Sequence, residues 1–150
     1  MPERKVCLED VIPLMLEALE RGQSVRFSPK GTSMRPMLRQ GVDSVTLSPV
    51  TGELGKYDLP FYRRADGSYV LHRIVAAGEI YTCMGDNQFQ PERGVTREQM
   101  IAVVTAFSRG GKEHSVQEPL YRMYCRLWHF SRPVRRLWRW GLTCLRRSFE

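Results

Sequence analysis

The sequence lacks the features that mark disulfide-rich, metal-binding or membrane-spanning proteins. Its cysteines form no Cys-x-x-Cys pair and show no zinc-type His/Cys spacing, so we expect neither a disulfide framework nor a metal or other cofactor. Residues 1–23 contain no long apolar run, because charged side chains interrupt them, and predict neither a signal peptide nor a transmembrane helix. This pattern favours a cytoplasmic protein with reduced thiols. The four cysteines are Cys7, Cys83, Cys125 and Cys144.

Positive charge is confined to the C-terminal part of the chain. Residues 1–118 hold 15 Lys and Arg against 15 Asp and Glu, so this part is neutral. Residues 119–150 hold eight Arg and one Glu, which accounts for the whole formal net charge of +7. The basic character therefore says nothing about the partners of the larger, N-terminal part.

Hydrophobic periodicity divides the chain into one helix followed by short strands. Apolar residues recur at helical spacing from Leu8 to Leu19; Asp10 is predicted to cap this helix and Gly22 to end it. Asp66-Gly67 lies between two strand-like runs and predicts a hairpin. The predicted strands span 24–28, 42–48, 58–63, 69–76, 80–84 and 100–107.

This pattern predicts a mainly β fold with flanking helices. We expect an N-terminal helix within 1–23, a β-rich domain over 24–110, and a basic, aromatic helical tail over 118–150, broken at Arg132-Pro133. The Gly-rich segment 108–115 is predicted to be a linker.

A segment rich in Gly, Pro and hydroxyl side chains interrupts the strands around Ser33. Acyl transfer by serine needs an exposed hydroxyl, a base, and N–H donors that face the developing oxyanion. Gly31 would let a substrate approach the backbone, and free N–H groups after Ser33 would point at the reacting atoms. Taken alone, the segment is more typical of a polar turn.

Partners for Ser33 are found downstream. His72 is the best-placed base, because His114 and His129 fall in the predicted linker and tail. A histidine in an apolar strand is nevertheless more often a partly buried structural ring. Asp86 follows a predicted strand within Gly-Asp-Asn and is the candidate acid, although such an aspartate usually closes its own turn.

In combination, these motifs resemble the signal peptidase I superfamily, which includes the LexA-type self-cleaving repressors. Ser-Met-x-Pro-x-Leu at 33–38, His-Arg-Ile-Val at 72–75 and Gly-Asp-Asn at 85–87 carry the resemblance, which covers about residues 24–107. It implies a signal-peptidase/LexA-like catalytic domain. The branch with a histidine base, similar to the endoplasmic-reticulum signal peptidase, is indicated because 57–111 contains no lysine.

The resemblance also implies roles for individual residues. Ser33 would be the nucleophile and His72 the base, and either Asp86 or Glu92, six positions later, would complete the triad. The sequence does not choose between these two acids. Ser33 and Thr32 would bind the oxyanion, and the substrate would lie against Gly31 and Met34.

The chain departs from the family pattern at three points. Gly31 stands where the family has a serine that helps bind the oxyanion, and losing one such donor typically costs on the order of a hundredfold in rate. Val42 is inserted into the Gly-Asp motif that opens the next strand. The membrane anchor that normally precedes the serine is absent, so the expected substrates lie on the cytoplasmic side.

The tail, residues 119–150, admits three interpretations. It is a helical hairpin that packs on the β domain, a basic amphipathic anchor on the inner face of the membrane, or a nucleic-acid-binding segment. The third is the weakest, since no nucleic-acid-binding motif is present. We favour peripheral membrane contact.

The sequence therefore predicts a serine endopeptidase that resembles signal peptidase and cleaves a precursor or leader peptide, with small residues preferred before the scissile bond. The alternative is a peptide-binding or regulatory module of the same fold with weak or no catalysis, for which Gly31 and Val42 argue. Self-cleavage of the LexA type is poorly supported, because Ala77-Gly78 lies in a predicted turn and the lysine is absent.

Overall fold

The computed structural model describes residues 8–147, so Cys7 lies outside the described part of the chain. A leading helix, antiparallel strands and two C-terminal helices are present, so the predicted flanking helices are confirmed, but the fold is mixed α/β and not mainly β. The elements are α1 (Leu8–Glu20), β1 (Val25–Phe27), β2 (Ser44–Pro49), β3 (Pro60–Arg63), β4 (Tyr69–Leu71), β5 (Arg73–Ala76), β6 (Tyr81–Met84), β7 (Glu92–Val95), the 3₁₀ turn η1 (Arg97–Gln99), β8 (Met100–Arg109), β9 (Lys112–Ser115), α2 (Pro119–Phe130) and α3 (Arg132–Arg147).

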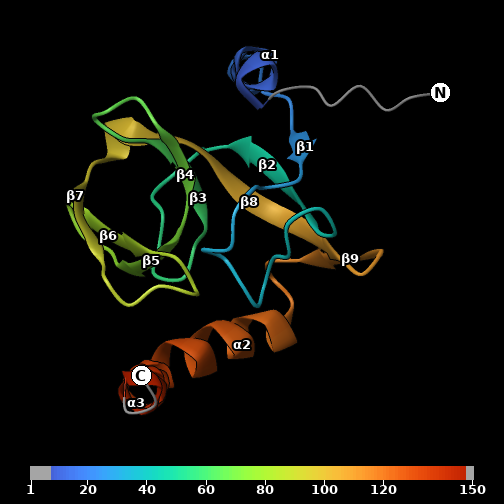
Figure 1. The fold of residues 1–150 in the computed structure, drawn as a ribbon. Helices are drawn as coiled ribbons and strands as arrows, with labels where there is room; N and C mark the ends of the chain where they lie inside the picture. The colour runs from blue at the N-terminus through green and yellow to red at the C-terminus, as the bar shows by residue number, and fades with distance from the viewer. Residues whose placement is uncertain (1–7, 148–150) are drawn as a thin grey trace.

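The strands form two antiparallel sheets. The larger sheet has the order β1-β2-β8-β3-β4, with β9 paired to β8, and the smaller has the order β5-β6-β7. Figure 1 shows β3 to β7 curving round one side of the molecule while β8 crosses its centre. The helix α1 lies at one end of the sheets and α2 runs along the other (Figure 1). Strand β4 is left as an edge of the larger sheet.

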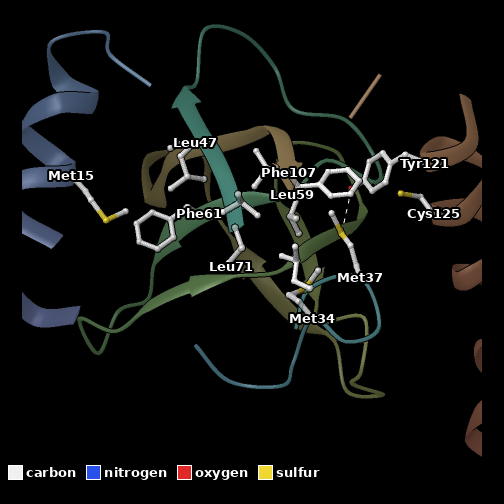
Figure 2. Close-up of a cluster of buried hydrophobic side chains, with 14 of the residues drawn as sticks. Met15, Met34, Met37, Leu47, Leu59, Phe61, Leu71, Phe107, Tyr121 and Cys125 are labelled. Atoms are coloured by element: carbon white, nitrogen blue, oxygen red, sulfur yellow. Dashed lines mark hydrogen bonds between the residues drawn. The ribbon is translucent and has the colours of Figure 1, made fainter. Parts of the chain in front are cut away.

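Helices α1 and α2 share one core with the larger sheet. Met15 enters it from α1, whereas Tyr121 and Cys125 enter from α2 on the opposite side (Figure 2). Burying a large apolar side chain stabilises the fold by roughly 1.5–3 kcal/mol. The helices are therefore integral to the fold. Between them lie Met34, Met37, Leu47, Leu59, Phe61, Leu71 and Phe107.

The end of α1 agrees with the sequence, but its start does not. Gly22 has a φ of 77° and donates its N–H to Leu19 O at 3.0 Å, while Gln23 N–H donates to Ala18 O at 2.9 Å. This pair of bonds is a glycine-terminated C-cap, as predicted. Asp10, predicted as the N-cap, lies inside the helix, because the apolar spacing already begins at Leu8.

The predicted linker is wrong, because residues 108–115 form the hairpin that joins β8 to β9. Arg109 pairs with Lys112, and the two glycines between them have φ values of 57° and 80°. Two successive positive φ angles suit a tight hairpin turn, and glycine adopts them without steric cost. The larger sheet therefore continues to Ser115.

The predicted strand 69–76 is divided at His72. Its first part, β4, pairs with β3, and its second part, β5, joins the smaller sheet. Strand β7 was not predicted, because its polar sequence lacks alternation. The hairpin at Asp66-Gly67 is confirmed by a 2.8 Å hydrogen bond from Arg64 N–H to Ser68 O. The predicted break in the tail is also present, at Ser131, directly before α3.

Candidate active site

Ser33 lies on a compact turn that is held to the core by its neighbours. Met34, Met37 and Leu38 are buried in the main hydrophobic cluster, whereas Ser33 is half-buried. Within the turn, Leu38 N–H donates to Met34 O at 3.0 Å. Burial of the apolar residues that follow Ser33 thus anchors the turn on the core and leaves the serine partly exposed.

Gly85-Asp86-Asn87 packs directly against this turn. Asn87 donates its N–H to Ser33 O at 2.8 Å and its side-chain amide to Thr32 O at 3.2 Å. A Cβ on Gly85 would lie 2.6 Å from Ser33 O, which is closer than such atoms approach, so no larger residue fits here without movement. The Gly-Asp-Asn segment therefore fixes the backbone of the candidate nucleophile.

Asp86 is paired with Arg73 and makes no hydrogen bond to His72. The two buried side chains form a fork of 2.8 and 2.9 Å, and the Tyr124 hydroxyl donates to Asp86 Oδ2 at 3.0 Å. A fork of this kind neutralises two charges in a dry environment. Asp86 thus joins β5 to the nucleophile turn and to α2.

The second candidate acid, Glu92, faces His72 through Tyr62. The Tyr62 hydroxyl donates to Glu92 Oε2 at 2.7 Å and lies 3.5 Å from His72 Nδ1. Glu92 Oε2 itself is 4.0 Å from Nδ1. Of the two predicted acids, Glu92 is therefore the one in the immediate environment of the histidine.

Arg64 holds the carboxylate of Glu92 in place. Its guanidinium donates from Nε to Oε1 and from Nη2 to Oε2, both at 2.9 Å. Arg64 and, to a lesser degree, Tyr62 lower the pKa of Glu92, so the acid is ionised at neutral pH. Burial raises the pKa of Tyr62 well above its ordinary range, so its hydroxyl remains a donor.

These contacts select the tautomer of His72. The single Tyr62 proton is directed to Glu92 at the shorter distance, so the Tyr62 oxygen can only accept from Nδ1–H. Nε2 then carries the free lone pair. Burial, aided by the charge of Arg64 and opposed by that of Glu92, lowers the pKa of His72 to about 4. The ring is therefore neutral at pH 7 and can accept a proton.

Ser33 and His72 line the same pocket, which has a volume of about 250 Å³. Its walls include Gly31 and Met34 on one side and Leu71, from the edge strand β4, on the other. Within residues 8–147, no hydrogen bond joins the Ser33 hydroxyl to the His72 ring. Catalytic hydrogen bonds often form only when substrate is bound. The absence of this bond is therefore compatible with His72 acting as base, because both side chains line the same pocket.

Of the predicted oxyanion and substrate residues, Ser33, Gly31 and Met34 line this pocket, whereas Thr32 does not. In the described chain, the N–H of Ser33 and the hydroxyl of Thr32 donate no hydrogen bond, and both are available to a ligand. Gly31 has a φ of 88°, and its N–H donates to Gln40 Oε1 at 3.0 Å. A serine at position 31 would need an unfavourable left-handed backbone.

Two residues of the candidate site, Tyr62 and Arg64, were not predicted from the sequence. Tyr62 lies in β3 and Arg64 directly follows it. In the sequence, Tyr62 looks like an ordinary apolar residue of a strand. A signal was nevertheless present, because the register of the hairpin opposes Tyr62 to Val70. A residue opposite Val70 is diagonal to His72 on the same face of the sheet.

Compared with known proteins, the sequence matches no protein-family model and no curated protein. Within residues 8–147, no three His, Cys, Asp or Glu side chains are grouped as metal ligands would be.

Proposed function

We propose that the chain is a serine endopeptidase of signal-peptidase-like fold, with Ser33 as nucleophile and His72 as base. The observation that carries this proposal is the pocket of about 250 Å³ that both side chains line. A chain of contacts from Glu92 through Tyr62 reaches the far side of the same histidine. A base, an orienting acid and a nucleophile in this order are the elements of nucleophilic acyl transfer.

The reaction follows from the assigned tautomer. His72 Nε2 takes the proton of the Ser33 hydroxyl as Oγ attacks the scissile carbonyl carbon, and the N–H of Ser33 donates to the oxyanion. The C–N bond then breaks, and His72 gives its proton to the leaving amine. A water molecule, deprotonated by the same nitrogen, attacks the acyl-enzyme and releases the new carboxyl end while Ser33 regains its proton.

Glu92 acts in this scheme through Tyr62. When His72 becomes an imidazolium, the positive ring lies 4.0 Å from the ionised Glu92 carboxylate. The opposite charge stabilises the imidazolium, while the Tyr62 oxygen keeps Nδ1–H directed away from the pocket. Asp86 supports the site indirectly, by fixing the turn that packs on Ser33.

The substrate is a peptide that binds as an added strand beside β4. This strand is the edge of its sheet, and its residues 69–71 face Pro29 and Gly31 across the pocket. A second pocket of about 240 Å³ continues between the same two segments toward Met15 of α1. An extended chain would gain backbone hydrogen bonds along such an edge and place alternate side chains in the pockets.

The test uses a pool of synthetic peptides with alanine, glycine and serine at varied positions. We expect new termini, detected by mass spectrometry, with the wild-type protein and none with Ser33→Ala or His72→Ala. Ser28→Ala and His114→Ala are the matched controls, because both lie outside this pocket. Cleavage by folded Ser33→Ala at the wild-type rate would refute the mechanism.

A second candidate function is a peptide-binding module without efficient catalysis. The missing Ser33–His72 hydrogen bond and the positive φ of Gly31 favour it. Saturable binding of pool peptides, measured by fluorescence anisotropy, without any cleavage by the wild-type protein would support this function over the first.

A further inference from the structure

Helix α3 has two chemically distinct sides. At 100° per residue, the arginines fall on one side and most large apolar side chains on the other, with Trp140 and Leu142 at the borders. The arginine side comprises Arg132, Arg135, Arg136, Arg139, Arg146 and Arg147. The apolar side comprises Val134, Leu137, Trp138 and Leu145.

Arg135 and Arg139, from the arginine side of α3, contact the rest of the protein. The Arg135 guanidinium lies 3.7 Å from the centre of the Trp128 ring and donates to the Trp128 carbonyl at 2.8 Å. It also lies 5.7 Å from the Phe89 ring, over which Arg139 stands at 5.3 Å. These cation–π and hydrogen-bond contacts dock the helix by its charged side.

The apolar side of α3 is consequently exposed. Val134 is 70% exposed, Leu137 67%, Trp138 71% and Leu145 58%. An amphipathic helix of a globular protein normally buries this side, so the orientation is the reverse of the usual one. Figure 1 places α3 at the far end of α2, away from α1.

Helix α2 adds a second exposed apolar stripe. Leu120, Met123, Leu127 and Phe130 recur at spacings of three and four residues and are all exposed, while Tyr121 and Cys125 occupy the buried side. Two adjoining helices therefore leave large apolar side chains in contact with water.

The charge of α2 and α3 restricts which partner can cover their exposed apolar side chains. Residues 119–147 contain eight arginines and neither Asp nor Glu. A second copy of the chain would bring like charges together at the borders of the helix. Nucleic acid could pair with the exposed arginines of α3, but it would leave the exposed Leu137 and Trp138 in water. An anionic bilayer accepts both an apolar helix face and flanking arginines.

We propose that α3 lies in the surface of an anionic lipid bilayer. Its apolar side enters the boundary between headgroups and acyl chains, and the exposed Arg136, Arg146 and Arg147 pair with lipid phosphates. No helix within 8–147 is long and apolar enough to cross a bilayer, so the contact is peripheral. This proposal does not depend on the protease mechanism.

The membrane contact would also place the candidate active site near the lipid surface. Trp128 Nε1–H donates to Asp86 O at 2.7 Å, and Arg135 donates to the same oxygen at 3.4 Å. The neighbouring residue, Asn87, holds the Ser33 turn. The Gly85-Asp86-Asn87 segment thus contacts both the helices that meet the bilayer and the turn that carries Ser33.

The test is flotation of the purified full chain with vesicles of phosphatidylcholine and phosphatidylglycerol in equal amounts. We expect the protein to float with these vesicles, to shift its tryptophan emission to shorter wavelength, and to bind pure phosphatidylcholine more weakly. Leu137→Glu/Trp138→Glu should reduce partitioning about tenfold or more. Val42→Glu/Ile80→Glu, which changes two equally exposed apolar residues of the β domain, should not.

Three outcomes would overturn the proposal. The first is that the wild-type protein stays in the lipid-free fraction, and the second is that Leu137→Glu/Trp138→Glu floats as well as wild type. The third is that the wild-type protein binds neutral and anionic vesicles equally. A dimer that the variant dissociates, seen by light scattering without flotation, would assign the surface to a second copy instead. Val134→Glu/Leu145→Glu repeats the test at independent positions, with circular dichroism to confirm folding.

Discussion

Glu92 and His72 face each other across the hydroxyl of Tyr62. The carboxylate oxygen is 4.0 Å from the ring nitrogen, and the hydroxyl lies 2.7 Å from the former and 3.5 Å from the latter. The acid therefore influences the base through its charge and through a shared neutral group. In the triads of serine peptidases, by contrast, the acid hydrogen-bonds directly to the histidine.

Replacing Tyr62 by Phe should separate these two influences. Nδ1–H loses its acceptor while the charge of Glu92 stays, so we expect kcat/KM to fall about ten- to a hundredfold. Tyr81→Phe is the matched control, because this buried tyrosine on β6 forms no side-chain hydrogen bond in the described chain. An equal loss of activity in both variants would assign the effect of Tyr62 to packing alone.

The pH dependence of cleavage should reflect the buried environment of His72. Because its pKa lies near 4, the ring stays neutral through the mildly acidic range, and kcat/KM should halve only near pH 4. A histidine with the ordinary pKa of about 6.5 would leave about a tenth of the activity at pH 5.5. The measurement is kcat/KM against pH for a cleaved peptide without titratable side chains.

Arg64→Gln provides the check on this profile. The variant removes a positive charge that lowers the pKa of His72, so the acidic limb of the kcat/KM profile should move to higher pH.

The low pKa of His72 also destabilises the folded protein in acid: the unfolded chain takes up a proton on this histidine below about pH 6.5, and the folded chain only near pH 4. Unfolding free energy should therefore decrease as the pH falls through this window.

Asp86 and Glu92 should give different results when each is replaced by its amide. Asp86→Asn leaves Arg73 as a buried charge with weakened pairing, and breaking such a pair typically costs roughly 3–5 kcal/mol. We expect lower stability in urea, with activity lost in proportion to folded protein. Glu92→Gln, on a partly exposed side chain, should retain the fold and lower kcat/KM.

The double variant Arg73→Met/Asp86→Asn completes this comparison. If the two side chains act chiefly on each other, the double variant is less destabilised than the sum of the single variants. Full stability of Asp86→Asn together with a loss of kcat/KM would contradict this assignment and make Asp86 the triad acid.

Gly85→Ala should displace the candidate nucleophile. The added methyl group would lie 2.6 Å from the Ser33 carbonyl oxygen, and a backbone atom has little freedom to retreat. We expect a loss of roughly 1–3 kcal/mol in urea unfolding and reduced cleavage. Gly52→Ala is the matched control, because no atom lies within 4 Å of its added Cβ. Near-wild-type stability and activity of Gly85→Ala would show that the contact is not restrictive.

The sequence predicts those elements whose pattern is local. The Asp66-Gly67 hairpin, the glycine end of α1 and the break in the tail each depend on a few adjacent residues. Strands β7 and β9 were missed because their side chains are mostly polar, and only pairing with β6 and β8 makes them strands.

The contacts of the candidate site depend on chain segments far apart in sequence. Motif resemblance points to Ser33, His72 and both acids, but the pairing of Asp86 with Arg73 arises only when β5 meets the turn after β6. The orientation of α3 was equally hidden, since its periodicity specifies two sides without saying which one packs. The contacts of Arg135 with Trp128 decide that question.

Helix α2 contributes Trp128, whose Nε1–H donates to the Asp86 carbonyl. The same helix buries Tyr121 and Cys125 in the hydrophobic core. Replacing the chain from Pro119 onward would thus remove Tyr121 and Cys125 from the hydrophobic core. Arg73 would at the same time lose the Tyr121 hydroxyl and the Cys125 sulfur to which it donates. Heating should therefore melt α2 and the Gly-Asp-Asn turn in one cooperative transition.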